Sequence, residues 1–226
     1  MTDPAQNPSE PQLEIRIIPV TPLQQNTSMV WCRKTMTGIF IDPGGDVEKL
    51  MGAASHFGVT IKEIWLTHGH LDHAGGATEI KERTGAPIIG PHPDDQWLLD
   101  DLESQGAKYG ITGCRNVQPD RYLDEGDTLE LGGQTFEVAH TPGHTPGHVI
   151  MYNTPGQLAF VGDVLFKGSV GRTDFPRSSH EQLIDSVRDK LWPLGPGMRF
   201  VPGHGPMSTF GAEMQTNPFV SHAALA

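Results

Sequence analysis

The sequence contains few cysteines and few positive charges, and it lacks long apolar runs. Its two cysteines, Cys32 and Cys114, have no CxxC spacing, so we expect no disulfide framework and a reducing compartment. The chain has 16 Lys and Arg against 27 Asp and Glu, for a formal net charge of −11. An acidic surface repels phosphate backbones, which makes nucleic acid an unfavourable partner. No apolar run reaches the roughly 18 residues of a membrane-spanning helix.

The N-terminal segment shows no export signal. Residues 1–11 are polar and rich in proline, without a basic stretch or an apolar core, and they are expected to form a disordered tail. A single domain is predicted over residues 12–226, and its 36% hydrophobic residues are enough to bury a core. We therefore expect a cytoplasmic protein that does not bind a membrane.

Strand and helix patterns occur in both halves of the chain. Alternating or short apolar runs predict strands at 13–20, 27–32, 38–45, 61–67, 86–90, 127–133, 134–140, 148–153, 157–163 and 198–205. Helices are predicted at 46–58, 76–85, 93–106 and 178–194, the first with Asp46 as N-cap and Gly58 after its last turn. Two sheets packed face to face with helices outside them would accommodate this order, which predicts an α/β fold.

The densest chemical signal is THGHLDH at residues 67–73, directly after an apolar strand. It holds four candidate metal ligands: His68, His70, Asp72 and His73. Glycines around them permit tight turns, and imidazole with carboxylate suits zinc, iron or manganese. The alternative is a polar loop at a helix start that Asp72 caps, but it would leave several ligand-type side chains unpaired at one edge.

Three further segments repeat this local design of an apolar strand followed by a glycine-flanked ligand type. They place His144 in FEVAHTPGH, Asp163 in LAFVGD and His204 in RFVPGH. Asp163 has a second interpretation, as a cap for the loop that follows it. If all these strands end at one edge, the side chains converge. Two ions roughly 3.5–4 Å apart could then share a hydroxide and stabilise an oxyanion.

The order H-x-H-x-D-H, P-G-H, G-D and P-G-H, from about residue 13 onward, resembles the metallo-β-lactamase superfamily. The resemblance implies an αββα four-layer sandwich with a site for two divalent metal ions at one edge, zinc first and iron or manganese as alternatives. It implies that one ion is held by His68, His70 and His144, that the second is held by Asp72, His73 and His204, and that Asp163 bridges them.

The stretch HTPGHTPGH at 140–148 repeats TPGH and contains three histidines, and the resemblance selects His144 as the ligand. His140 still belongs to the preceding strand and is expected to be an ordinary core residue or a partner behind the site. His148 is expected to hydrogen-bond near the site without binding metal. The remaining histidines are expected to be surface residues: His56, His92, His180 and His222.

Within the superfamily, the sequence is most similar to the short bacterial branch of the type II glyoxalases, the hydroxyacylglutathione hydrolases. The stretches that carry this likeness include THGHLDHAGG, LFKGSVGRTDFP and FVPGHGPMSTFGAEMQTNPFV. The resemblance implies hydrolysis of a glutathione-derived thioester such as S-lactoylglutathione. A hydroxide held by the two ions would attack the carbonyl, and Asp72 would orient this hydroxide. The thiolate would leave without a strong general acid because the pKa of an ordinary thiol is about 8.5.

One part of the chain departs from the longer glyoxalases, whose C-terminal helical segment binds glutathione through basic residues. Only 22 residues follow His204 in this 226-residue chain, and none is Lys or Arg. The loop GSVGRTDFP is expected to bind the substrate instead, through Arg172 as a fork for a carboxylate and Lys167 nearby. The alternative for Arg172 is an internal salt bridge with Asp174.

Two other functions are alternatives. Persulfide dioxygenases share the sandwich and the GRTDF stretch, and they use a single iron that would be held here by His68, His144 and Asp163. They tend to lack a histidine where His148 stands, which favours the hydrolase. A metal-binding scaffold without turnover is disfavoured because all seven candidate ligands are present. A purely structural metal site needs no open position. The oligomeric state is not predicted.

Overall fold

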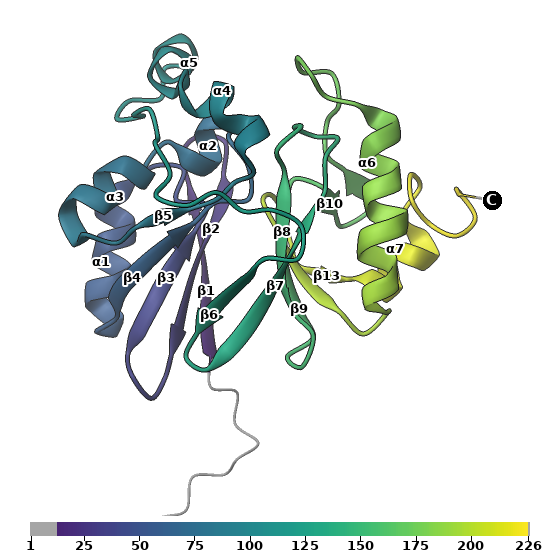
Figure 1. Cartoon of the computed structure of the whole chain (residues 1–226), viewed down its shortest axis with the longest axis horizontal. Coiled ribbons are helices and arrows are strands. Elements are labelled where there is room, and N and C mark those ends of the chain that lie inside the picture. The colour runs from purple at the N-terminus through teal and green to yellow at the C-terminus, as the bar shows by residue number, and fades with distance from the viewer. Residues whose placement is uncertain (1–12, 226) are drawn as a thin grey trace, which may run out of the picture.

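The computed structural model describes residues 13–225 and shows two β-sheets packed face to face, with helices on both outer faces (Figure 1). This arrangement confirms the predicted αββα four-layer sandwich. The predicted disordered tail at residues 1–11 lies outside the described residues. Among residues 13–225, no helix combines the length and the apolar character that a bilayer crossing requires.

The first sheet has five strands in sequence order. They are β1 (Leu13–Val20), β2 (Gln25–Cys32), β3 (Thr37–Ile41), β4 (Thr60–Trp65) and β5 (Ile88–Ile89). The first three pair antiparallel, whereas β3, β4 and β5 run parallel. Helices α1 (Val47–Phe57) and α3 (Ala77–Thr84) pack on its outer face through Leu50 and Ile80. Both helices end at glycines in the left-handed conformation, Gly58 and Gly85, as the sequence predicts.

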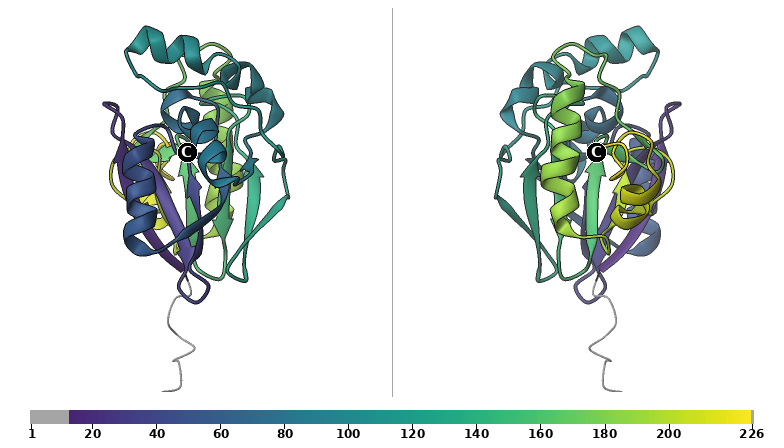
Figure 2. Two further views of the ribbon diagram at one scale, coloured as in Figure 1. Left: turned by 90° about the vertical axis from the view of Figure 1, so that its left-hand side faces the viewer. Right: turned by 90° about the vertical axis from the view of Figure 1, so that its right-hand side faces the viewer.

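The second sheet has six strands in the order β13-β12-β9-β8-β7-β6. Their bounds are β6 (Thr128–Leu131), β7 (Gln134–His140), β8 (Val149–Asn153), β9 (Leu158–Gly162), β12 (Arg199–Pro202) and β13 (Ser208–Thr209). Helices α6 (His180–Ser186) and α7 (Phe210–Thr216) cover it through Leu183 and Phe210. Side views show these two helices on the opposite side from α1 and α3 (Figure 2). A short hairpin of β10 (Leu165–Phe166) and β11 (Ser169–Val170) follows β9.

Alternation along the central strands separates three cores. Ile39 and Ile41 of β3 point between the sheets, whereas Phe40 packs under the helices of the first sheet. Trp65 and Phe136 meet between the sheets, with ring centroids 5.5 Å apart. Each such fully buried side chain contributes about 1.5–3 kcal/mol. Because both faces of these strands are covered, their sequences are almost continuously apolar.

Three predicted helix features differ from the structure. The segment predicted as one helix at 93–106 is a 3₁₀ turn (Pro93–Asp95), then α4 (Gln96–Leu99) and α5 (Leu102–Tyr109). The break falls at two aspartates, a residue type that competes with the helical backbone for hydrogen bonds. Asp46 precedes α1 but does not cap it, because its carboxylate accepts the N–H of Thr21 at 2.9 Å. The helix predicted over 178–194 continues beyond α6 as a π turn at Val187–Leu191 and a 3₁₀ turn at Trp192–Leu194.

The two sheets are tied together at one edge by backbone hydrogen bonds. The N–H of Val149 donates to the carbonyl of Thr67 at 2.8 Å, and the N–H of Asn26 donates to the carbonyl of Gly203 at 2.7 Å. Several strands end at this edge, and α2 (Leu71–Ala74), α4 and α5 lie over it in Figure 1. Loops from both sheets therefore meet at this edge of the sandwich.

Candidate metal centre

The segment that leaves β4 is held in place by Asp42 at the end of β3. Its carboxylate accepts the backbone N–H of Thr67 at 2.7 Å and the Thr67 hydroxyl at 2.6 Å. From that fixed point the chain stays extended through His70, which occupies the N-cap position of α2. The first turn of α2 then presents Asp72 and His73, so the four ligand types of this segment face one place.

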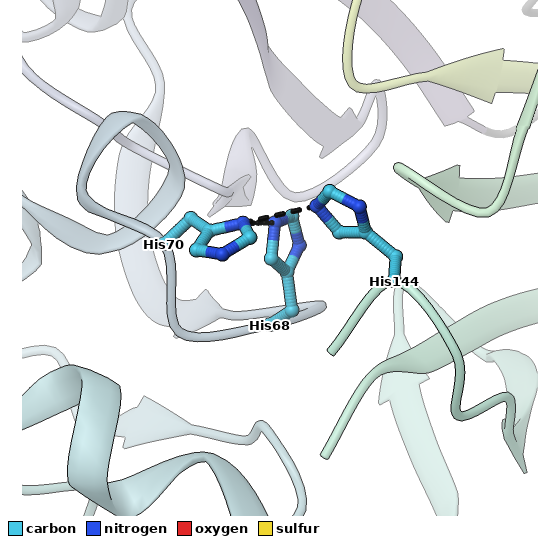
Figure 3. Close-up of side chains that lie close together, drawn as sticks. All are labelled: His68, His70 and His144. Carbon is cyan, nitrogen blue, oxygen red and sulfur yellow. Dashed lines mark hydrogen bonds between the residues drawn. The ribbon is translucent and has the colours of Figure 1, made fainter. Parts of the chain in front are cut away.

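Three histidines form a first cluster. Nδ1 of His70 lies 3.1 Å from Nε2 of His68 and 2.9 Å from Nε2 of His144, which comes from the turn between β7 and β8 (Figure 3). Nitrogen ligands about 2.0–2.1 Å from a tetrahedral ion would be about 3.3 Å from one another. The three nitrogens are thus spaced almost as ligands of one ion.

Asp72, His73 and His204 form a second cluster, whose potential ligand atoms all lie within 4.8 Å of one another. His204 follows β12, and its Nε2 is 3.2 Å from Oδ2 of Asp72. Nε2 of His73 is 3.9 Å from the same oxygen. His73 is fully buried, while His204 is partly open to solvent.

Asp163, which follows β9, lies between the two clusters. Its Oδ2 is 3.6 Å from Nε2 of His144 and 3.7 Å from Nε2 of His204. Its Oδ1 is 3.4 Å from Nε2 of His73. A cap for the following loop would not require this placement, so the geometry supports the bridging interpretation over the capping one.

Backbone hydrogen bonds and tautomers direct several of these rings. His144 donates from Nδ1 to the carbonyl of Arg172 at 2.8 Å, which leaves the Nε2 lone pair for the cluster. Nδ1 of His73 lies 3.0 Å from the carboxylate of Asp42. Sequence reasoning missed Asp42, although IDPGG repeats the design of an apolar strand followed by a ligand type. Gln25 is a further neighbour, 3.4 Å from Nδ1 of His73.

His148 makes the hydrogen bonds near the site that the sequence predicts. Its Nε2 accepts the N–H of Asp163 at 3.1 Å, and its Nδ1 lies 3.1 Å from the Thr141 hydroxyl. Both ring nitrogens therefore have protein partners, and neither lone pair is left for an ion. His148 instead fixes the backbone from which the Asp163 carboxylate projects.

His140, the first histidine of the stretch at 140–148, pairs with His92. His140 and His92 stack with ring centroids 4.2 Å apart, and Nε2 of His140 donates to the carbonyl of Pro146 at 2.8 Å. The prediction that His92 is a surface residue is wrong: it is half-buried, and its Nδ1 accepts the N–H of Asp94. The three others predicted at the surface are exposed: His56, His180 and His222.

Unsatisfied polar atoms mark the centre of the cluster. Within residues 13–225, only three buried side-chain N or O atoms lack a hydrogen-bond partner, and two of them are Nε2 of His73 and Oδ1 of Asp163. An unsatisfied buried polar group costs about 1–3 kcal/mol. A divalent cation between them would remove that cost, and imidazole with carboxylate suits zinc, iron or manganese. The residues therefore fit divalent metal ions.

Burial sets the charge of the first cluster. It lowers the pKa of His70 to about 3, and repulsion from His144 adds to the effect. It also lowers the pKa of His68 and of His144. All three rings are therefore neutral at pH 7, which is the form that binds metal.

The carboxylates of the second cluster stay ionised. Burial by itself would raise the pKa of Asp163, but the neighbouring His73 and His144 hold it well below its usual range. The same balance of burial against His73 and His204 lowers the pKa of Asp72. Conversely, Asp163 and Asp72 raise the pKa of His73 well above its ordinary value despite its burial.

The loop predicted to bind substrate borders the first cluster. The Phe175 ring lies 5.0 Å from the ring of His70 and 5.8 Å from that of His144. Arg172 is exposed and forms the salt bridge considered as its alternative, with Nε and Nη2 donating to Asp174 at 2.9 and 2.8 Å. Lys167 is exposed in the turn between β10 and β11.

Comparison with known proteins agrees with this geometry. Residues 20–204 match the family model of the Metallo-beta-lactamase superfamily. The hydroxyacylglutathione hydrolase GloC of Haemophilus influenzae is 43% identical over 210 residues, which cover 92% of this chain and 99% of that protein.

Two solved structures are similar over most of their length. The BLEG-1 B3 metallo-beta-lactamase is 33% identical with a TM-score of 0.84, covering 92% of this chain and 99% of that one. TTHA1623 in a di-iron-bound form is 37% identical with a TM-score of 0.81, covering 91% and 100%. ETHE1 from Myxococcus xanthus is a more distant neighbour, at 25% identity and a TM-score of 0.74, covering 92% and 84%.

Proposed function

The chain belongs to the metallo-β-lactamase superfamily, whose model matches residues 20–204, and we propose that it hydrolyses glutathione-derived thioesters such as S-lactoylglutathione. One observation carries the proposal: seven side chains from both sheets converge as two clusters with Asp163 between them. The similarity to GloC over nearly its whole length supports the thioester class.

We propose that this centre holds two divalent ions, zinc first, with iron or manganese as alternatives. The first ion would be held by His68, His70 and His144, the second by Asp72, His73 and His204, with Asp163 shared. When bound, such ions polarise a carbonyl oxygen and lower the pKa of water toward neutrality.

The chain's own groups supply orientation. Asp72 lies at the second cluster and stays ionised at pH 7, so its carboxylate can accept a hydrogen bond from the attacking water and aim it at the carbonyl carbon. The three neutral rings of the first cluster act as ligands and do not donate protons. No general acid is needed because a thiolate of ordinary pKa, near about 8.5, is a good leaving group. Phe175 covers the first cluster with an apolar ring.

Arg172 is the proposed contact for a substrate carboxylate. Its partner Asp174 is exposed, and exposed ion pairs add little stability. An incoming carboxylate can therefore replace Asp174 on the guanidinium fork at small cost. Lys167, in the preceding turn between β10 and β11, would add a second positive charge.

The experiment that tests the function combines metal analysis with two substrates. Purified protein is assayed for metal content, for cleavage of S-lactoylglutathione and for oxygen uptake with glutathione persulfide. We expect about two ions per chain and thioester cleavage without oxygen uptake. One iron per chain with oxygen uptake would instead show a persulfide dioxygenase, and metal-loaded protein inactive on both substrates would contradict the proposal.

A further inference from the structure

Asp95 is a buried carboxylate that the proposed reaction does not use. It ends the 3₁₀ turn before α4, and none of its surface is exposed. Its Oδ2 accepts the N–H of Gly69 at 2.9 Å and the hydroxyl of Thr145 at 2.7 Å. Its Oδ1 accepts the N–H of Gly147 at 2.6 Å. Three donors thus converge on one side chain.

The three donors belong to the two loops that carry the first cluster. Gly69 lies between His68 and His70, whereas Thr145 directly follows His144. The first loop leaves β4 of one sheet, and the second joins β7 to β8 of the other. A single carboxylate therefore links a loop of each sheet. These loops carry His70 and His144, whose Nδ1 and Nε2 atoms lie 2.9 Å apart.

Close packing leaves these loops little freedom around Asp95. A Cβ atom on Gly147 would lie 2.5 Å from the backbone nitrogen of Asp95 and 2.7 Å from its carboxyl carbon. A Cβ atom on Gly69 would lie 2.9 Å from Cβ of Leu98 and 3.0 Å from the carbonyl oxygen of Asp95. Glycine is therefore required at both positions, and the carboxylate sets the distance between the loops.

The buried position of Asp95 disfavours its charged form. Burial raises the pKa of Asp95 to about 6, although the donors from Thr145, Gly69 and Gly147 partly oppose the rise. A group whose folded-state pKa is raised loses its stabilising contribution as pH rises through that value, so ionised Asp95 lowers stability at neutral pH. A buried charge kept at a cost is typical of a functional role.

We propose that Asp95 is a positioning residue that sets the separation of His70 and His144 and thereby the metal affinity of the cluster His68, His70 and His144. The inference rests on the proposed metal centre, but it does not depend on the substrate. Partners that orient metal ligands typically change metal affinity by about 10–100-fold when they are removed.

The test is Asp95→Asn. The variant side chain has one acceptor oxygen, so its amide group must turn a donor toward either the Gly147 N–H or the Gly69 N–H. Zinc is titrated into folded, metal-free protein in competition with a chromophoric chelator. The titration is done in a His204→Ala background so that the first cluster is the tight site. We expect affinity at this cluster to fall about 10–100-fold, while the metal-free variant still unfolds in one cooperative thermal transition.

Two further variants separate positioning from a general effect on folding. Asp100→Asn changes an exposed carboxylate on the same segment that accepts from the Gln96 side chain, and it should leave zinc affinity unchanged. Thr145→Val removes one donor and should weaken zinc binding several-fold. Because that hydroxyl acts through Asp95, the double variant with Asp95→Asn should lose less than the product of the two single losses.

The outcomes are distinguishable. Wild-type zinc affinity in Asp95→Asn, or an equal loss in the Asp100→Asn control, would overturn the role of Asp95. Should Asp95→Asn fail to fold, Thr145→Val decides: weaker zinc binding supports the proposal, and wild-type affinity overturns it. A wild-type chain that binds no zinc would instead overturn the metal centre itself, whatever its activity on thioesters.

Discussion

Oδ2 of Asp163 lies 3.6 Å from Nε2 of His144, and both residues follow strands of the second sheet. The same oxygen lies 3.7 Å from Nε2 of His204 in the other cluster. One carboxylate therefore contacts both halves of the proposed centre. Asp163→Asn removes the negative charge between the clusters, and we expect metal content to fall from about two ions to about one, with a loss of thioester hydrolysis by orders of magnitude.

Metal analysis of dialysed protein and steady-state kinetics measure this effect. Asp189→Asn is the matched control, because it replaces a carboxylate exposed on the π turn after α6. Two ions retained by Asp163→Asn would show that the carboxylate is not shared.

The tandem repeat separates a proposed ligand from its neighbour. His144→Ala removes a nitrogen from the first cluster, and hydrolysis of S-lactoylglutathione should fall by orders of magnitude. His140→Ala removes only the stacking on His92 and the hydrogen bond to Pro146, so substantial activity should remain. The measurement is kcat/KM for both variants. Equal losses would refute the assignment of His144 within the repeat.

Acid should destabilise the metal-free protein. The pKa of His70 is about 3 in the folded chain and about 6.5 when unfolded. As the pH falls from 7 to 5, His70 becomes protonated in the unfolded chain but stays neutral in the folded chain. The free energy of unfolding therefore decreases. Burial lowers the pKa of four more histidines and adds to this slope: His68, His92, His144 and His148.

Three groups oppose the acid effect without reversing it. His73, His204 and Asp95 have raised pKa values, so their contribution to stability is lost as pH rises, but they are fewer than the five histidines with lowered values. Thermal unfolding of chelator-treated protein at pH 5, 6 and 7 measures the sum. His70→Gln should flatten the dependence, and a melting temperature that rises on acidification would contradict the charge states described for the first cluster.

The exposed pair of Arg172 and Asp174 predicts opposite effects of two variants. Arg172→Ala should raise KM for a glutathione thioester several-fold with kcat nearly unchanged, because the contact acts on binding and lies outside the reacting centre. Asp174→Ala frees the guanidinium fork from its partner and should lower KM. Thioesters without carboxylates provide the control, since neither variant should alter their KM. A kcat effect in Arg172→Ala would contradict a purely binding role.

Gly203 tests how closely the backbone approaches the metal centre. A Cβ atom there would overlap Oδ1 of Asp163 and lie 2.6 Å from Cε1 of His73. Gly203→Ala should therefore displace both side chains, and we expect loss of bound metal and activity. Gly52→Ala in α1 is the opposite case, because a Cβ atom there meets nothing within 4 Å. It should stabilise the fold by up to about 1 kcal/mol, as thermal unfolding would show.

Local chemistry explains what could be predicted from the sequence. Glycines after α1 and α3 mark helix ends because they accept the left-handed conformation. Apolar strands such as β4 and β9 are visible as runs, and the residues that follow them are of ligand type. These signals depend on neighbouring residues only, so these elements and the candidate ligands can be predicted from the sequence.

Contacts between distant segments could not be predicted in this way. Asp42 and His73 are 31 positions apart, and Asp95 and Gly147 are 52 apart. An aspartate at a strand end or at a helix start has the same local sequence whether it is exposed or buried between loops. For the same reason, the local sequence predicts a surface position for His92, whereas its ring stacks on His140.

The residue types that can bind metal, and the strands that precede them, are visible in the sequence because periodicity and glycine conformation act over a few residues. Which side chains face one another, which carboxylates orient histidines, and the pairing of Arg172 with Asp174 depend on the folded chain. Those features depend on how two sheets, formed from opposite halves of the chain, align at one edge. That alignment follows from burial of the core between them, which involves residues far apart in sequence.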